Sequence, residues 1–209
     1  MKKSALNKIA IGTSIAIAFA MSSVSMSTLA HAANSQSFTS TMSAQTTPIR
    51  INVVLGDDLA YRADHVSKNR RDRNGTRSLR YGWSGQGKYD QRDLDRLTQR
   101  LKKKMESQFA KNGIAMSDTS NTVLNIVITD ARPNRPTFEQ LKQPGLSLRS
   151  FGIGGAKFEA SMTSSGSDIG TLTYAWYETD IIDASFATTW TDANRAIDRF
   201  ARKTARALK

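Results

Sequence analysis

The sequence has no cysteine and only two histidines among its 209 residues. Without thiols the chain can form no disulfide and no thiolate metal site, and it has no cysteine nucleophile. It also lacks the lipid-modified cysteine that tethers many exported bacterial proteins to a membrane. His31 lies in a segment that we expect to be removed, so His65 is the single imidazole expected in the mature chain. One histidine disfavours a zinc site, and we expect no metal and no cofactor.

Long apolar runs are also missing, since no stretch after residue 21 approaches the roughly 20 apolar residues that span a bilayer. The apolar run at residues 9–21 follows three lysines and precedes Ala30-His31-Ala32. These are the parts of a secretory signal peptide. The alternative, a retained membrane anchor, is disfavoured by the small-x-small exit. We predict cleavage between Ala32 and Ala33 and export to the bacterial periplasm without a lipid anchor.

The remaining chain is long enough for one domain with its own core. We expect a flexible segment at residues 33–46, where Ser, Thr, Ala, Gln and Asn show no apolar periodicity. A single domain should then fill residues 47–209, with a long basic loop at 57–89 that has no convincing period. A connection of this length is unusual inside a domain, so it is either functional or poorly ordered.

Hydrophobic periodicity predicts two helices in this domain. Leu94, Leu97, Leu101, Met105 and Phe109 form one apolar stripe over residues 91–112, with Asp90 as the expected N-cap. A second helix is expected at the C-terminus. Its apolar positions and its expected N-cap are Trp190, Ala193, Ile197, Phe200, Ala201, Leu208 and Thr191.

Alternating or β-branched runs predict strands at residues 49–53, 122–130, 156–162 and 170–178, the last two as a hairpin around residues 164–167. Leu172, Tyr174 and Trp176 share one strand face, which we interpret as core. The order of elements predicts an α+β fold: a two-layer sandwich with a small, mostly antiparallel sheet and two helices on one face.

The positive charge is concentrated in one region. Residues 62–111 contain 15 basic and 6 acidic residues, a balance of +9, and the rest of the expected mature chain is balanced. We interpret the region as a surface for anionic partners, the alternative being an ordinary solvated basic face that aids solubility. The candidate anion-binding residues are Arg70, Arg71, Arg73, Arg77, Arg80, Arg96, Arg100 and Lys103. Tyr81, Trp83 and Tyr89 are candidate aromatic contacts, because aromatic rings stack on bases or sugars.

Catalytic patterns are weak. Gly82, Gly85 and Gly87 do not follow the phosphate-loop order, so we expect no nucleotide cofactor. The sequence has no Gly-x-Ser-x-Gly elbow for a nucleophile. A glycan hydrolase would need paired carboxylates, and Glu159 and Glu178 are expected on neighbouring hairpin strands. We interpret those two as a cross-strand surface pair and expect no enzymatic activity.

An ordered set of features spans about residues 122–208. It comprises a strand ending Ile128-Thr129-Asp130, Pro133 and Pro136, a glycine-led strand from Gly152-Ile153-Gly154-Gly155-Ala156 through Phe158-Glu159, and a helix opened by Thr189-Trp190 and continued by Ala193, Ile197, Phe200 and Ala201. This set resembles an uncharacterised family of bacterial envelope proteins, a domain of unknown function that includes many lipoproteins. The resemblance implies an exported, non-catalytic envelope protein and no particular activity. The chain lacks the lipoprotein cysteine, and its basic loop has no counterpart in the family.

Taken together, the sequence predicts a periplasmic accessory or binding protein of the cell envelope. The expected partner is an anionic component such as lipopolysaccharide, acidic phospholipid or peptidoglycan, and export makes nucleic acid the least expected polyanion. Two alternatives stay open. One is a protein–protein interaction module for a membrane-anchored partner, docking by a sheet edge or the hairpin. The other is a hydrolase of envelope polymers. The sequence does not indicate an oligomeric state.

Overall fold

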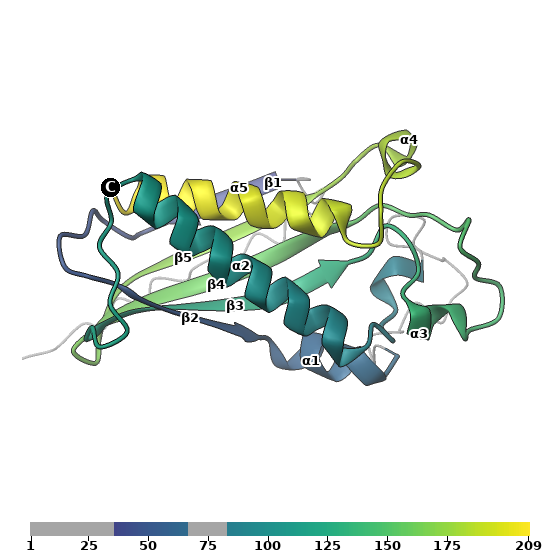
Figure 1. The fold of residues 1–209 in the computed structure, drawn as a ribbon, viewed down its shortest axis with the longest axis horizontal. Helices are drawn as coiled ribbons and strands as arrows, with labels where there is room; N and C mark the ends of the chain where they lie inside the picture. Colours follow the sequence, from purple (N-terminus) through teal and green to yellow (C-terminus); the bar gives the residue numbers. More distant parts are fainter. Residues whose placement is uncertain (1–35, 67–82) are drawn as a thin grey trace, which may run out of the picture. The chain divides into compact units, whose positions relative to one another are not determined.

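A computed structural model describes residues 36–66 and 83–209 of the chain. Its elements follow one another as strands, helices and one short 3-10 helix (Figure 1). They are β1 (Gln36–Ser40), β2 (Arg50–Leu55), α1 (Asp57–Asp64), η1 (Trp83–Gly85), α2 (Gln91–Lys111), β3 (Thr122–Arg132), α3 (Phe138–Leu141), β4 (Gly155–Ser164), β5 (Ser167–Tyr177), α4 (Ile181–Ala184) and α5 (Thr191–Ala207).

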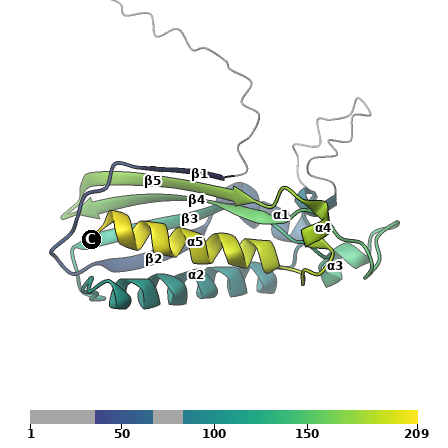
Figure 2. The ribbon, with the colours of Figure 1, turned by 90° about the horizontal axis from the view of Figure 1, so that it is seen from above.

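The five strands form one sheet in the order β1-β5-β4-β3-β2. Neighbouring strands are antiparallel except for the parallel pair β2 and β3. Helices α2 and α5 lie side by side on one face of this sheet (Figures 1 and 2). The predicted α+β fold, with a mostly antiparallel sheet and two helices on one face, is therefore confirmed.

Apolar stripes hold the two helices on the sheet. All five predicted stripe residues of α2 are buried. On α5, Phe200 stacks on Phe158 of β4 with ring centroids 4.7 Å apart, and both rings contact Tyr174 of β5. Burying each such side chain contributes about 1.5–3 kcal/mol before the cost of ordering it. The core therefore lies between the sheet and this one helical layer.

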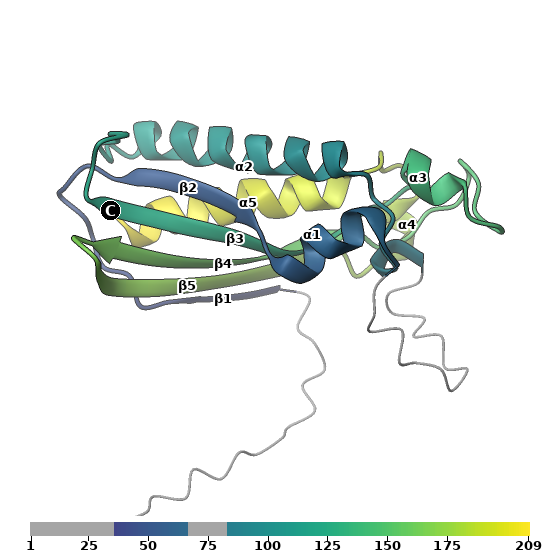
Figure 3. The same cartoon turned by 90° about the horizontal axis from the view of Figure 1, so that it is seen from below.

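Helices α2 and α5 leave the other face of the sheet uncovered (Figure 3). Along β3, buried Leu124 and Ile126 alternate with Asn125, whose side chain accepts a hydrogen bond from Asn52 Nδ2 at 3.0 Å. Charge on this face includes the ion pair between Lys157 and Glu159, 2.7 Å apart. Antiparallel sheets commonly have one core face and one solvated face, and this sheet follows that pattern.

The predicted helix starts are half right. Asp90 caps α2, because its side chain accepts a hydrogen bond from the backbone N–H of Arg92. The prediction of Thr191 as the α5 N-cap is wrong, since Trp190 holds that position without a side-chain bond. Thr191 is the first helical residue, and its hydroxyl accepts instead from the backbone N–H of Thr188.

The expectation of a flexible segment at residues 33–46 is wrong for residues 36–40, which form β1. Their composition gave no periodic signal, but β5 offers them a free sheet edge with backbone partners. Phe38 packs edge-on against Tyr174, with 6.3 Å between ring centroids. Tertiary pairing therefore orders a polar stretch whose sequence alone would leave it unstructured.

The expectation of an irregular loop at residues 57–89 is also wrong in part. Residues 57–64 form α1, and residues 83–85 form η1. Helix α1 packs against β3 and α2, where Leu59 and Ala63 are buried. Its short apolar face is completed by Arg62, a residue that hydrophobic periodicity scores as polar. Residues 67–82 of the predicted loop lie outside the described residues.

The backbones of β4 and β5 approach each other closely at Gly155. At Gly155, which opens β4, φ is +149° and an added Cβ would lie 2.3 Å from the carbonyl oxygen of Trp176. We expect Gly155→Ala to lower the free energy of unfolding by about 2–4 kcal/mol, measured by urea denaturation. Gly166→Ala, also at positive φ but in open space, is the control and should cost only about 1–2 kcal/mol. If both variants lose the same free energy of unfolding, the crowding of Gly155 against the Trp176 carbonyl is not what makes the substitution costly.

Candidate anion-binding surface

Most of the predicted anion-binding arginines cannot be placed. They and one aromatic residue lie outside the described residues: Arg70, Arg71, Arg73, Arg77, Arg80 and Tyr81. Their role stays a prediction.

The other three predicted cations lie on α2 in different environments. The side chain of Arg96 is 79% exposed, with its guanidinium 3.7 Å from the Asp93 carboxylate. Lys103 is exposed. Arg100 faces α5, where its Nη2 lies 3.6 Å from Oδ1 of Asp198. Arg96 and Lys103 are thus available to a partner, whereas Arg100 helps to join the two helices.

Helix α5 adds a row of cations that the sequence analysis missed. Arg195, Arg199, Arg202 and Arg206 recur at steps of four, three and four residues, so they follow one stripe along the helix, with Lys203 beside it. The charge count treated this segment as part of a neutral remainder. The spacing itself was the signal that would have found the row.

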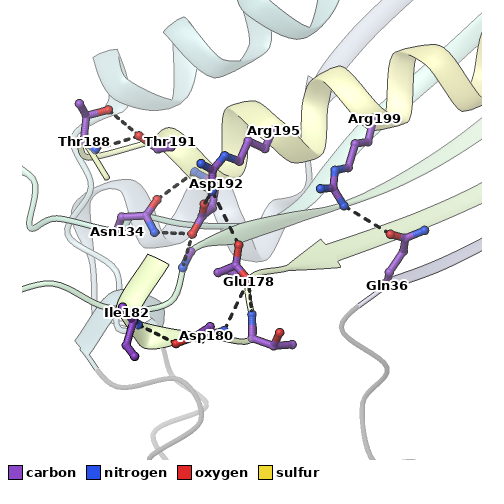
Figure 4. A network of polar contacts seen from close by, with 12 residues as sticks. Gln36, Asn134, Glu178, Asp180, Ile182, Thr188, Thr191, Asp192, Arg195 and Arg199 are labelled. Atoms are coloured by element: carbon purple, nitrogen blue, oxygen red, sulfur yellow. Dashed lines mark hydrogen bonds and ion pairs between the residues drawn. The ribbon is translucent and has the colours of Figure 1, made fainter. Parts of the chain in front are cut away.

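Two of these cations are held over aromatic rings at the edge of the sheet. The guanidinium carbon of Arg199 lies 4.3 Å from the ring centroid of Trp176, and its Nη1 donates to Gln36 at 3.5 Å (Figure 4). The ammonium of Lys203 lies 5.0 Å from the ring of Phe38. Rings of β1 and β5 therefore fix the direction of these side chains while leaving the charge at the surface.

The structure separates charge by layer. Helices α2 and α5 together contain twelve basic and five acidic residues, and one of those acids, Asp192, is buried. The other described residues contain nine basic and twelve acidic residues. We name the outward face of α2 and α5 the cationic helix layer. Its exposed or half-exposed basic residues include Arg92, Arg96, Lys103, Arg195, Arg199, Arg202, Lys203 and Arg206.

A buried polar network fixes where α5 begins (Figure 4). The side-chain carbonyl of Asn134 accepts from the backbone N–H of Asp192 at 2.9 Å, and the Asn134 amide donates to the Asp192 carboxylate. Asp192 also accepts from the backbone N–H of Gly154 at 3.3 Å. Arg195 then bridges Asp192 and Glu178, at 3.1 and 3.7 Å. This network sets the start of the arginine row relative to β4 and β5.

The two ends of the basic segment at residues 67–82 are tied to the same end of the sheet. Val66, which precedes it, forms an antiparallel bridge with Gly87. Gln140 of α3 donates to the Gly87 carbonyl at 2.9 Å. Trp83, which follows the segment, lies beside Gly152, and Ser84 donates to the Ile153 carbonyl. The points where the segment joins the fold are therefore well defined.

Asp130 is the charged centre of this attachment. Its carboxylate accepts from Arg62 at 3.0 Å and from Tyr177 at 2.7 Å, and lies 2.9 Å from Nε of Arg132. Burial alone would raise the pKa of Asp130, but Arg132 and Arg62, with the Tyr177 hydroxyl, outweigh it and hold the pKa below its usual range. Asp130 therefore stays ionised and anchors α1 to β3.

One predicted aromatic contact is wrong. Tyr89 is fully buried, its hydroxyl donates to the Ser84 carbonyl at 2.8 Å, and its ring meets Trp190 edge-on. Burial also raises the pKa of its phenol. Tyr89 is a core residue and cannot contact a partner. Trp83 is half-buried, and its predicted contact role stays a prediction.

The predicted carboxylate pair is not a pair. Glu159 lies opposite Thr173 on the open face and binds Lys157, whereas Glu178 follows the end of β5 and contacts Arg195. Their interpretation as cross-strand partners is therefore wrong, because β5 ends its pairing one residue before Glu178. Among residues 36–66 and 83–209, no three His, Cys, Asp or Glu side chains are grouped as a metal site.

Comparisons with known proteins show distant likenesses of fold. No family model and no curated protein matches the chain. The PelC dodecamer from Paraburkholderia phytofirmans has 8% identity and a TM-score of 0.41, covering 83% of this chain and 99% of that one. A variant of that dodecamer has 8% identity and a TM-score of 0.42 over 83% and 98% of the two chains. A minor lipoprotein from Acinetobacter baumannii has 12% identity and a TM-score of 0.30 over 75% and 89%.

At these TM-scores the likenesses carry no inference about function, and membership of the envelope family of unknown function stays a prediction. Within the part of the chain that the structure describes, no helix has the length and apolar character needed to cross a membrane.

The carboxylate of Asp130 should make the stability of the fold depend on pH. Its pKa is lowered by folding, so its stabilising effect is complete above the usual aspartate pKa of about 3.9 and is lost as pH falls through the lower folded value. At pH 7, Asp130→Asn leaves the buried Arg62 with only the exposed carboxylate of Asp58 as a partner charge and should lower the free energy of unfolding by about 3 kcal/mol. The difference from the unmodified chain should shrink below about pH 4.

Urea denaturation at several pH values measures this difference. Exposed Asp168→Asn is the matched control and should change stability little at any pH. A deficit in Asp130→Asn that is the same at pH 7 and at the lowest pH would show that the carboxylate charge is not what stabilises the cluster.

Proposed function

We propose that this chain is a non-catalytic accessory protein of the bacterial cell envelope, which binds an anionic envelope component through its cationic helix layer and the arginine-rich segment at residues 67–82. One observation supports the binding role above all: twelve cations against five acids on α2 and α5, with a net negative remainder of the described residues. A chain that used basic residues only for solubility would have no need to gather them on one face.

The chemistry of the cations favours phosphate or carboxylate as the recognised group. Four of the five basic residues of α5 are arginines, whose planar fork donates two parallel hydrogen bonds to either group. Arg199 is already oriented by Trp176, so less side-chain freedom is lost on binding. In the envelope these groups occur in lipopolysaccharide, acidic phospholipid and peptidoglycan.

The proposal also includes residence in the periplasm after cleavage between Ala32 and Ala33. Support comes from the leader sequence, the absence of cysteine and the resemblance over residues 122–208. No catalytic role is proposed, because Glu159 and Glu178 are each bound to a separate cation and do not converge.

The helix layer is tested by charge removal on opposite faces of the sheet. The variant Arg202→Ser with Arg206→Ser removes two exposed cations from α5. The control Arg50→Ser with Lys157→Ser removes the same charge from the open face. Binding of lipopolysaccharide at low salt should weaken about tenfold in the first variant and little in the control. Equal weakening in both would mean that net charge, and not the layer, governs binding.

The arginine-rich segment is tested separately. Replacing Arg70, Arg71, Arg73, Arg77 and Arg80 by Ser should abolish most binding to lipopolysaccharide, and binding of the unmodified chain should fall steeply as salt rises. Unchanged binding in this variant would remove the segment from the proposal, leaving the helix layer to be judged on its own experiment.

A further inference from the structure

One end of the fold exposes an unusual amount of apolar side chain. Nine large hydrophobic residues are exposed in the part of the chain that the structure describes, and six of them lie on α3, on α4 or in the loops beside them. Phe186 is 92% exposed, Phe138 84%, Leu148 72% and Ile182 68%. Figures 1 to 3 all place α3 and α4 at the same end of the sheet. We name these six residues the apolar end: Phe138, Leu148, Phe151, Ile181, Ile182 and Phe186.

Arg135 joins two of the segments that carry these residues. Its guanidinium donates to the carbonyls of Ser185 and Ala187, on either side of Phe186, and to the carbonyl of Arg149, next to Leu148. The same guanidinium lies 5.4 Å from the ring centroid of Phe151. A single half-buried side chain therefore joins the loop before β4 to the turn after α4.

Several backbone groups of these segments form hydrogen bonds within the segments. Thr137 and Gln140 form a capping box at the start of α3, and Asp180 caps α4. Ser150 donates to the Ser147 carbonyl at 2.9 Å, and the N–H groups of Ser185 and Ala187 donate back into α4. Backbone groups that are already paired lose little on entering an apolar medium, whereas unpaired ones lose several kcal/mol each.

Charge does not explain this surface. Residues 137–151 and 180–187 contain two basic and three acidic residues, in contrast to the excess of cations on α2 and α5. One of the acids, Glu139, is paired with Lys142 at 2.6 Å. Attraction to an anionic polymer is therefore excluded as the reason for these side chains, and burial of apolar area is left as the driving force.

We propose that the apolar end inserts Phe138, Leu148, Ile182 and Phe186 into the interfacial region of a lipid bilayer. The four side chains belong to α3, to the loop before β4, to α4 and to the turn after α4, and each is more than two-thirds exposed. A fluid bilayer accommodates such separate projections, whereas a protein partner would need a matching socket for each. Helix α5 follows α4 in the chain, and its Arg195 contacts Glu178, which precedes α4. Cations at the start of α5 therefore lie near the apolar end, where anionic headgroups would favour the same orientation.

The experiment uses vesicles of neutral phosphatidylcholine and of phosphatidylcholine with phosphatidylglycerol, and measures co-sedimentation of the full mature chain. The unmodified chain should bind the neutral vesicles, and this binding should persist at high salt. Phe138→Ser with Phe186→Ser should weaken it about tenfold or more, because membrane affinity follows the buried apolar area. Both residues are almost fully exposed, so the melting temperature should not change.

The control is Val54→Ser with Met116→Ser, which removes two exposed hydrophobic residues that do not belong to the apolar end and should leave vesicle binding unchanged. Failure of the unmodified chain to bind neutral vesicles would overturn the proposal. So would equal binding by the Phe138 and Phe186 double variant, or a loss of self-association in that variant with lipid binding intact, since the latter would identify a protein interface.

This proposal and the proposed function fail separately. Arg202→Ser with Arg206→Ser should reduce only the salt-sensitive binding to phosphatidylglycerol vesicles and leave binding to neutral vesicles intact. The phenylalanine variant should reduce binding to both kinds of vesicle. If only the arginine variant shows its expected effect, the binding role of the cationic helix layer stands and membrane insertion by the apolar end is wrong. If only the phenylalanine variant does, the reverse holds.

Discussion

Burial of two apolar stripes on one face of a single sheet is the constraint on which the rest of this structure depends. The Leu94 to Phe109 stripe of α2 and the Ile197 and Phe200 stripe of α5 both require an apolar partner, and the inward face of β3, β4 and β5 provides it. Because both apolar stripes face the sheet, the basic residues of the two helices lie on the outward face, in the seam between the helices or at the edge of the sheet. The cationic layer is therefore a consequence of the core, and its position follows from the same packing that makes the fold stable.

Two polar clusters fix the positions of the helices and loops at one end of the sheet. Asn134 and Asp192 fix the first turn of α5, and Asp130 with Arg62 fixes α1 and the residues that flank the basic segment. Both clusters are buried, and each joins segments far apart in the sequence. Buried polar groups are costly when a partner is missing, so these clusters favour one arrangement of the loops over looser alternatives. The apolar end projects from loops that are braced in this way.

The sequence predicts the secondary structure correctly where hydrophobic periodicity is strong. The α2 stripe, the β4–β5 hairpin and the C-terminal helix all follow from spacing alone, because each element buries a continuous face. It does not predict elements whose formation depends on contacts with residues far away in the sequence. Residues 36–40 form a strand because β5 has a free edge, and α1 is completed by Arg62, whose partner Asp130 lies 68 residues away. The place of Tyr89 among basic residues favours a contact role for its ring, but the ring is buried in the core and its hydroxyl donates to the Ser84 carbonyl.

The charge count shows a further limit of linear reasoning. Counted along the chain, the segment containing α5 is part of a neutral remainder, yet in space its acids and bases separate. Asp192 is buried and Asp198 is bound to α2, so the arginines of α5 remain at the surface with fewer acids than the sum suggests. Binding of a polyanion to the cationic helix layer depends on this local excess of charge and weakens as salt rises. Burial of the apolar end depends on neither the charge nor the salt concentration. The two surfaces therefore differ in the physical force they offer a partner, and salt dependence separates their contributions.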